Sequence, residues 1–313
     1  MKKGFYTILC LSALALCACG KEFELEIRSD TKLFLQCCPG NGDTTVLQLN
    51  RTYPVGKTAE NTLFLEEADI DFSVNGIPYY VQRAVDSAGP VPPGCWFVAA
   101  PLKAGDEVSV EARAAGLNPI SATTTLPAAA PEFTWHCTRE SVRVTFRDDP
   151  STDDWYGLAV YCERTIINLD SGKVFKVLKR NLRPQNGASD SWWYSAARNY
   201  VDIPFNGWSL GSVWSMVRVW PDTGFSGQEV TLFMHTSDIS SYWGNYEQRD
   251  RLKVRLYRFS KEFFRYGVAL EHIRDNDLAE IGLAPAAYAY SNVSGGVGIL
   301  AGWTVRETNW FVL

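Results

Sequence analysis

Apolar and polar residues alternate along much of the chain, which is the pattern of β-strands with one buried face. Over residues 69–74 the apolar side chains occupy every second position, and the dipeptide Asn75-Gly76 follows them directly. This dipeptide is typical of two-residue hairpin turns. We therefore predict an antiparallel hairpin that turns at Asn75 and Gly76.

The same period of two recurs in residues 106–113, 141–148 and 251–259. Each segment places valine, leucine or phenylalanine side chains on one face and mostly polar or charged ones on the other. Turn residues separate such segments at intervals of about ten positions, as in antiparallel sandwiches. The pattern predicts a mainly β protein built from antiparallel sheets.

A run of proline and alanine over residues 127–132 has little bulk to pack and is predicted to link two domains. Residues 25–126 hold enough strands for an immunoglobulin-like antiparallel β-sandwich. Residues 133–313 are predicted to form a second antiparallel β domain. Its one helix, at about 260–279 with Ser260 as N-cap, has an apolar stripe that we expect to pack on a sheet.

The N-terminus has the features of a secretory signal. Lys2 and Lys3 precede an uncharged run over residues 5–18, which small residues close. A helix that crosses the hydrocarbon core needs about 20 apolar residues, so this segment is expected to direct export rather than span the membrane. We predict a lipoprotein signal peptide over residues 1–18 and a lipidated tether over residues 19–24.

The residues Leu16-Cys17-Ala18-Cys19 resemble a bacterial lipobox, in which a small residue directly precedes the modified cysteine. Cys19 fits this position and Cys17 does not, so we expect the lipid on Cys19. A single acyl chain binds a membrane weakly, at about 0.8 kcal/mol per buried methylene, whereas the two or three chains of a bacterial lipoprotein would anchor it. An ordinary cleaved signal is the alternative.

The net charge of the chain limits which partners are expected, and its cysteines limit which disulfides are possible. The formal net charge is −5, and without Lys2 and Lys3 it becomes about −7, with no long basic block, so nucleic acid is not an expected partner. Five cysteines follow Cys19 in an export route that permits disulfides. Cys137 could meet Cys162, and Cys95 could meet Cys37 or Cys38, but spacing alone leaves these pairings open.

The segment Tyr290-Ser291-Asn292-Val293-Ser294-Gly295-Gly296-Val297-Gly298-Ile299, with the lipobox and the strands around residues 102–116, carries a wider resemblance. The chain resembles the Bacteroidota outer-membrane lipoproteins of domain-of-unknown-function family 4249. That resemblance implies a two-domain, mostly β lipoprotein, often encoded near TonB-dependent transporters. It implies no catalytic residue. Whether the protein faces the cell surface or the periplasm stays open.

Catalysis has one candidate motif. Gly207-Trp208-Ser209-Leu210-Gly211 matches the G-x-S-x-G pattern that presents a nucleophilic serine between a strand and a helix. The residues after Ser209 alternate as a strand does, so the required helix is not predicted. We interpret Ser209 as a turn residue and expect no enzyme, with a serine hydrolase as the alternative.

Metal and phosphate sites are weakly indicated. The acids within residues 148–154 could offer oxygens to calcium, but they lack the spacing of an EF-hand, and we favour a solvated turn. The glycines of residues 294–298 lack the lysine and threonine of a phosphate loop, so we favour tight backbone packing or a bulge. We expect no metal and no cofactor.

Two groups of residues are candidates for binding. Cationic side chains alternate over residues 249–255 and either attract an anionic partner or face acids on a neighbouring strand; these are Arg249, Arg251, Lys253 and Arg255. Aromatic clusters either contact a glycan or other partner, or cover a domain junction; these are Trp192, Trp193, Tyr194, Tyr242 and Trp243.

Together these features predict an outer-membrane-anchored, noncatalytic lipoprotein that acts as a ligand-binding or assembly partner. A TonB-dependent transporter is the expected neighbour, because the family resemblance implies one. A cell-surface adhesin or structural subunit is a further alternative, and it would show self-association or host-glycan binding instead.

Overall fold

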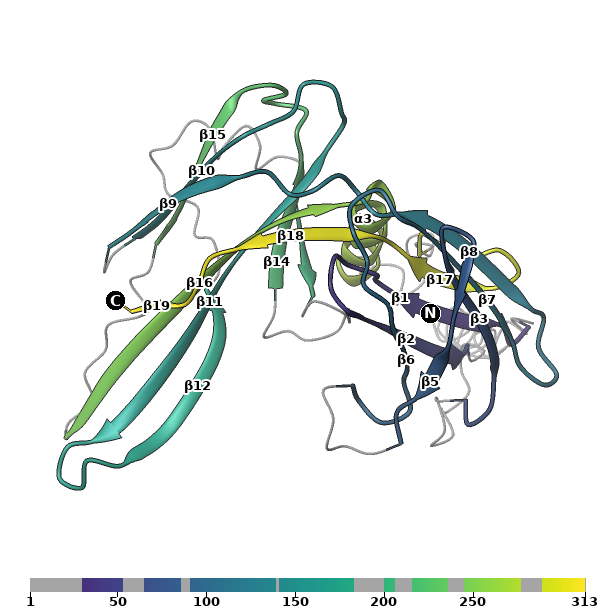
Figure 1. Cartoon of the computed structure of the whole chain (residues 1–313), viewed down its shortest axis with the longest axis horizontal. Coiled ribbons are helices and arrows are strands. Elements are labelled where there is room, and N and C mark those ends of the chain that lie inside the picture. The colour runs from purple at the N-terminus through teal and green to yellow at the C-terminus, as the bar shows by residue number, and fades with distance from the viewer. Residues whose placement is uncertain are drawn as a thin grey trace, which may run out of the picture.

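The computed structural model describes residues 30–52, 65–85, 91–138, 141–182, 200–205, 216–235, 245–276 and 289–312. These residues form a mainly β protein with four sheets and one helix (Figure 1). The fold class predicted from the alternating pattern is confirmed. Within these residues, no helix has the length and apolar character needed to cross a membrane.

Two sheets in the N-terminal half face each other and enclose one apolar core, which contains Leu35, Phe72 and Trp96. The first sheet has the order β17-β1-β2-β6-β5, and the second has the order β4-β3-β7-β8. Their strands are β1 (Leu33–Cys37), β2 (Thr44–Arg51), β3 (Asp69–Val74), β4 (Ile77–Tyr79), β5 (Val81–Arg83), β6 (Trp96–Ala99), β7 (Glu107–Arg113), β8 (Ile120–Thr125) and β17 (Val297–Leu300). The predicted sandwich-like architecture is confirmed.

The predicted hairpin joins β3 to β4, with Val74 opposite Ile77. Asn75 has a φ of 51° and Gly76 a φ of 77°, the left-handed conformations that this tight turn requires. The Asn75 amide also donates to Asp106 Oδ1 at 2.9 Å. The local sequence therefore determined both the turn and its position.

Two further sheets form the rest of the molecule. The larger has the order β13-β14-β11-β16-β18, with β12 paired to β11 and β19 paired to β16, and the smaller has the order β15-β10-β9. Their strands are β9 (Phe133–Cys137), β10 (Ser141–Arg147), β11 (Trp155–Asn168), β12 (Val174–Leu182), β13 (Val201–Pro204), β14 (Met216–Pro221), β15 (Glu229–His235), β16 (Tyr246–Phe259), β18 (Trp303–Glu307) and β19 (Phe311–Val312). Alternating residues such as Val144 and Val254 fill the core between the two sheets, as predicted.

Helix α3 (Lys261–Arg274) contributes Phe263 and Tyr266 to a core that also contains residues of the large sheet. Gly267 lies against Ile203 of β13, and a Cβ at this position would collide with it. Packing on a sheet is confirmed. Ser260 occupies the predicted N-cap position without a capping hydrogen bond from its side chain.

The predicted end of the helix at about residue 279 is wrong, because α3 ends at Arg274 and Asp275 leaves the helical conformation. The three residues that follow Arg274 are Asp275, Asn276 and Asp277, and they supply no apolar side chain that could pack on the sheet. Without such packing, a short helical extension is marginal in water.

Strand β17 connects the two halves of the molecule. The sequence assigned it to the second domain, but it pairs in parallel with β1, so Phe34 lies opposite Val297. Alternate residues of this pair enter different cores: Leu35 lies in the sandwich core, whereas Cys38 and Ile299 pack in the core that contains α3. The division into two domains stays a prediction. The predicted first domain, residues 25–126, does not include β17, because parallel pairing leaves no local sequence signal.

Polar side chains before β17 hold this strand in place. Ser291 Oγ accepts the amide hydrogen of Gly298 at 3.1 Å. The Asn292 side chain donates to the carbonyl oxygen of Leu300 at 2.7 Å and accepts from its amide at 3.0 Å. These residues belong to the segment that carries the family resemblance, and their role here is to fix backbone.

The glycines of the same segment allow close backbone contact. Gly295 has a φ of +77° and Gly298 a φ of +127°. A Cβ at Gly295 would collide with the carbonyl oxygen of Pro119, and a Cβ at Gly298 would collide with that of Leu35. The interpretation as tight backbone packing is confirmed.

Cys37, Cys38, Cys95 and Cys137 have free thiols, so none of the disulfides considered from the sequence is present among the described residues. Cys137 lies on β9 and Cys162 on β11, which belong to different sheets. Burial raises the pKa of the Cys38 thiol to about 12 and that of Cys137 to about 11. Such thiols are poor nucleophiles at neutral pH.

Candidate functional site

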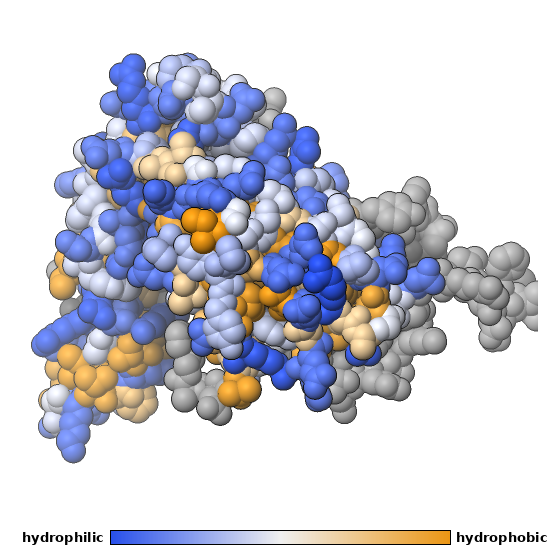
Figure 2. Space-filling model, turned by 45° about the vertical axis from the view of Figure 1, so that its right-hand side comes forward, coloured by the Kyte–Doolittle hydropathy of each residue, from blue (hydrophilic) through white to orange (hydrophobic). Residues whose placement is uncertain are grey.

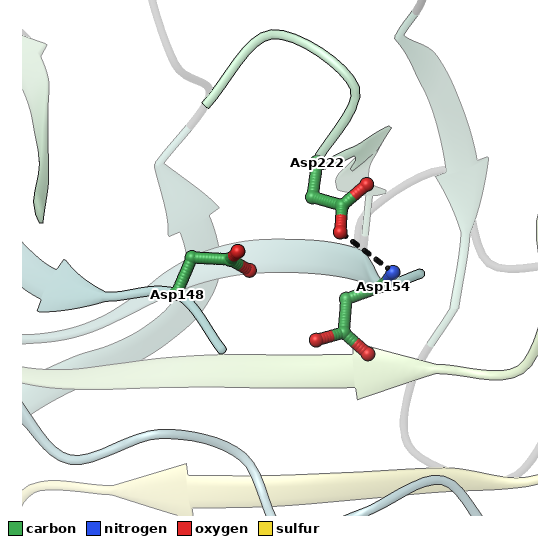
Figure 3. Close-up of side chains that lie close together, drawn as sticks. All are labelled: Asp148, Asp154 and Asp222. Atoms are coloured by element: carbon green, nitrogen blue, oxygen red, sulfur yellow. Dashed lines mark hydrogen bonds between the residues drawn. The ribbon is translucent and has the colours of Figure 1, made fainter. Parts of the chain in front are cut away.

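Three aspartates meet where strands of the two C-terminal sheets end. Asp148 follows β10, Asp154 precedes β11 and Asp222 follows β14. Each offers a carboxylate oxygen, and these oxygens lie within 4.8 Å of one another (Figure 3). All three residues are buried, although they come from separate turns.

The carboxylates are held by donors from the surrounding strands and turns. The Tyr156 hydroxyl donates to Asp148 Oδ1 at 2.7 Å and lies 3.1 Å from Asp154 Oδ2. The amide of Asp154 donates to Asp222 Oδ2 at 2.9 Å (Figure 3). Arg258 of β16 donates from Nε to Asp154 Oδ1 at 2.6 Å and from Nη2 to Asp154 Oδ2.

Burial changes the proton affinity of this cluster. It raises the pKa of Asp222 to about 6, and the neighbouring carboxylates Asp148 and Asp153 add to the shift. Burial, together with the hydrogen bond to Asp148, raises the pKa of Tyr156 well above its usual range. Asp222 is therefore the member of the cluster that takes up a proton near neutral pH.

Three carboxylates are hard oxygen ligands of the kind that calcium prefers. Here Arg258 forms a two-point ion pair with Asp154, and the amide of Gly227 donates to Asp148 Oδ2 at 2.7 Å. With the Asp154 amide bound to Asp222, all three carboxylates thus accept hydrogen bonds from protein donors. The arrangement acts chemically as a buried polar network that ties three turns to β16.

The predicted solvated turn over residues 148–154 is wrong for two of its acids. Asp148 is 3% exposed and Asp154 is 5% exposed, whereas Asp149 and Asp153 are exposed as expected. The sequence reasoning missed Asp222, because only the fold brings it and Arg258 to this turn. A Pro-Asp-Thr-Gly turn after a predicted strand was the available signal, and it does not report burial.

The basic row of β16 faces acids, as one of the two sequence interpretations proposed. Arg251 lies 2.6 Å from Glu163 of β11, and Lys253 and Arg255 each lie 2.7 Å from Glu307 of β18. Arg249 pairs with Glu247 on its own strand at 2.8 Å. The row is therefore compensated by ion pairs and does not present four free positive charges.

A cleft lies beside the point where the chain crosses from one sheet of the N-terminal sandwich to the other. It has a volume of about 670 Å³. Its lining combines aromatic, acidic, amide and guanidinium side chains and includes Asp69, Asp71, Tyr79, Tyr80, Gln82 and Arg83. The Tyr80 side chain is 81% exposed, so its ring is open to a ligand.

The charged groups of the cleft are fixed by their neighbours. Arg113 of β7 lies 3.1 Å from Asp71 and 3.6 Å from Asp69. Arg83 donates to the carbonyl oxygen of Leu65 at 3.3 Å and lies over the ring of Trp96 at 5.7 Å. The cleft is thus a polar recess with an aromatic wall on a rigid sheet framework.

The family model described as "Domain of unknown function (DUF4249)" matches residues 20–309. The chain belongs to this family. None of the curated proteins matches the chain. The match covers both sandwich sheets, the carboxylate cluster and the cleft, so these features lie within the DUF4249 domain.

Several predicted site residues lie outside the described part of the DUF4249 domain. They are Trp192, Trp193, Tyr194, Ser209, Tyr242 and Trp243. Cys19 lies outside the described residues as well and directly precedes the matched domain. The roles assigned to them from the sequence stay predictions.

Proposed function

We propose that this protein is a noncatalytic lipoprotein of the outer membrane that is anchored through Cys19 and binds a polar ligand in the cleft of its N-terminal sandwich. The anchor holds the domain beside the bilayer. The sheets position the ligand, and no covalent chemistry is required of the protein.

The cleft is the observation that carries the binding role. Exposed aromatic rings such as Tyr80 stack on the apolar faces of sugars, while carboxylates and amides such as Asp71 and Gln82 form hydrogen bonds with hydroxyl groups. Ligand sites are typically concave surfaces in which a small number of precisely placed polar groups orient the ligand. A glycan or another polyhydroxylated molecule matches this lining best.

The order of segments along the chain supports the anchor. The lipobox-like motif ends at Cys19, the DUF4249 match begins at residue 20, and the first described strand begins at Leu33. This order places the lipid at the start of a segment that leads into the folded domain. It is the arrangement expected of a tethered Bacteroidota lipoprotein.

A neighbouring transporter follows from the same proposal. A protein that concentrates a polar ligand at the outer membrane would serve a TonB-dependent transporter, the neighbour that the family resemblance implies. Co-purification of such a transporter after mild detergent extraction would support this role. Stable self-association without a transporter would favour an adhesin or structural subunit.

The cleft is tested with Tyr80→Ala and a panel of oligosaccharides. We expect the wild-type protein to retain a subset of the panel and the variant to lose about fivefold in affinity, because a stacking ring contributes on the order of 1 kcal/mol. Phe175→Ala is the matched control, since Phe175 is also exposed but lies outside the cleft. Equal binding by wild type and Tyr80→Ala would reject the cleft as the ligand site.

The anchor is tested by metabolic labelling with an alkyne fatty acid. Cys19→Ser is expected to lose the label and to leave the membrane fraction. Cys17→Ser is the matched control, because it changes the neighbouring cysteine and is expected to keep both. Membrane retention by Cys19→Ser would contradict the proposed anchor.

The noncatalytic part of the proposal is tested with a serine-directed fluorophosphonate probe. We expect the folded protein to remain unlabelled. Labelling that disappears in Ser209→Ala would instead establish a hydrolase.

A further inference from the structure

The large sheet extends into a projecting three-stranded tongue, which we define as residues 163–179 and 246–251 (Figure 1). Strand β11 lies at its centre and pairs with β16 along its whole length. Strand β12 pairs with the other side of β11. The tongue therefore consists of the far ends of β11 and β16, whose near ends lie in the core, and of the β12 residues that pair with β11.

Apolar side chains on β12 point away from any core. Val174 is 59% exposed, Phe175 66%, Val177 47% and Leu178 38%. Figure 2 shows apolar side chains gathered at the lower left, where the tongue projects. Contiguous exposed apolar residues at one place mark interaction sites far more often than scattered ones do.

No strand of the described residues pairs with the outer edge of β12. Within the described residues, β11 is the strand that pairs with β12. The opposite edge of such a strand presents a row of backbone N–H and C=O groups, which is a template for one more strand. The exposed apolar side chains lie along this same strand, so one ligand strand could contact both.

The charge of the residues along β12 indicates which kind of partner strand would bind there. Lys173, Lys176 and Lys179 are exposed along this segment. Lys179 lies 3.7 Å from Glu163, but the same carboxylate pairs with Arg251 at 2.6 Å, so it cannot compensate both cations. The segment keeps an excess of positive charge, which attracts acidic side chains.

The same charge disfavours a second copy of this chain. Two β12 strands paired edge to edge would lie about 5 Å apart. Their lysines would then repel one another inside the Debye length, which is about 10 Å at 0.1 M salt. Charged edge strands are a common device against self-association.

The tongue is rigid enough to bind without being ordered first. Arg164 of β11 donates to both carboxylate oxygens of Asp250 of β16 at 2.8 Å, and both side chains are buried. Phe175 packs on Tyr246 with ring centroids 5.2 Å apart. A preformed edge avoids part of the entropy cost of association.

We propose that the outer edge of β12 docks an extended, acidic segment of a partner protein, which adds to the large sheet as a further strand. This deepens the proposed function, because it assigns the partner-binding role to a surface separate from the cleft. On one face of the sheet, apolar residues of the segment would pack beside Val177, and on the other face its carboxylates would pair with Lys176.

The test uses the full chain in detergent and a fluorescent synthetic peptide that alternates Glu and Val and matches β12 in length. We expect binding by fluorescence anisotropy, and at least about tenfold weaker binding by the variant Lys176→Glu. A Lys-Val peptide should reverse this preference. Lys103→Glu is the matched control, because it reverses one exposed charge in the N-terminal half.

A second peptide separates strand addition from simple charge attraction. The same Glu-Val sequence with methylated backbone nitrogens keeps its charge but cannot donate strand hydrogen bonds, so it should bind at least about tenfold more weakly. Equal binding by both peptides, or no binding by either, would overturn the proposal. Unchanged thermal unfolding of the variants confirms that they fold.

Other outcomes would assign the edge differently. A dimer seen in sedimentation that Val177→Asp abolishes would identify a second copy as the occupant and overturn the acidic partner. Cys19→Ser separates this inference from the anchor: it should leave the membrane yet bind the peptide as the wild type does.

Discussion

Strands β17 and β12 are both rich in valine and leucine, yet their surroundings are opposite. Ile299 and Leu300 of β17 are fully buried because a core lies on each face of the strand. Val177 and Phe175 of β12 are exposed on the tongue. Burial of an apolar strand thus depends on what the fold places opposite it, and an apolar strand left uncovered is a candidate for binding.

The central strands β11 and β16 repeat this contrast along their own length. At one end, Asp154 and Arg258 lie in a buried network with Asp148 and Asp222. At the other end, β11 and β16 project into the tongue, where Arg164 and Asp250 form a buried pair between exposed neighbours. Four predictions test how differently these covered and uncovered regions respond to change.

The largest effect is expected from Gly298→Ala in β17. The added methyl group would meet the Leu35 carbonyl oxygen and would hold an unfavourable φ of +127°, so we expect a loss of about 4–5 kcal/mol in the free energy of unfolding, or failure to fold. Urea denaturation measures it. Gly42→Ala is the control, because no atom lies within 4 Å of its added Cβ, and it should change stability by less than about 0.5 kcal/mol.

Asp250→Ala should rank next, with a loss of about 3–4 kcal/mol, because it leaves Arg164 buried without its partner. The exposed pair of Arg249 and Glu247 offers the comparison on the same strand, and Glu247→Ala should cost far less stability than Asp250→Ala. Both values come from denaturant titration. Similar losses for the two variants would mean that the tongue is not an ordered extension of the sheet.

Asp222→Asn should stabilise the protein in a pH-dependent way. The pKa of Asp222 is about 6 in the fold and about 4 in the unfolded chain, so the fold binds more protons between these values and loses stability as pH rises through them. The amide keeps an acceptor for the Asp154 amide and removes this loss. We expect a gain of about 2 kcal/mol above pH 7 and almost none near pH 4. Thermal unfolding across this pH range measures it, and parallel pH profiles for both proteins would contradict the assignment.

Val177→Ala should have the smallest effect on stability, less than about 0.5 kcal/mol, because the side chain already meets solvent on β12. Val98→Ala, at a fully buried position of β6, should lose about 2 kcal/mol. Calorimetry distinguishes the two. A large loss at Val177 would show that this side chain is covered in the native protein and would remove the docking edge.

Local signals determined what the sequence could predict of the fold. The alternating strands and the turn at Asn75-Gly76 depend on neighbouring residues, and both are confirmed. The pairing of β1 with β17 joins Phe34 to Val297, and no pattern near either residue indicates it. The helix end also differed, because packing against β13 rather than propensity sets the length of α3.

The candidate sites were harder to predict, since their residues come from distant segments. Asp148 and Asp154 read as a solvated turn because Arg258 and Asp222 are far away in the sequence. The cleft was missed for the same reason: Tyr80 and Asp71 are unremarkable until β3 and β5 lie on either side of one recess. The four basic residues between Arg249 and Arg255, in contrast, were correctly predicted to lie on one strand. Only the structure identified the acidic side chains that pair with them.

The parallel pairing of β1 with β17 also has a consequence for biosynthesis. Val297, the partner of Phe34, lies 263 positions further along the chain, so the first sheet cannot be completed before that long segment has been synthesised. Contacts this distant in sequence slow folding and leave an open edge exposed in the meantime. Such a delay would suit the export that we propose, because a chain that cannot finish its first sheet early stays extended enough to be moved across a membrane.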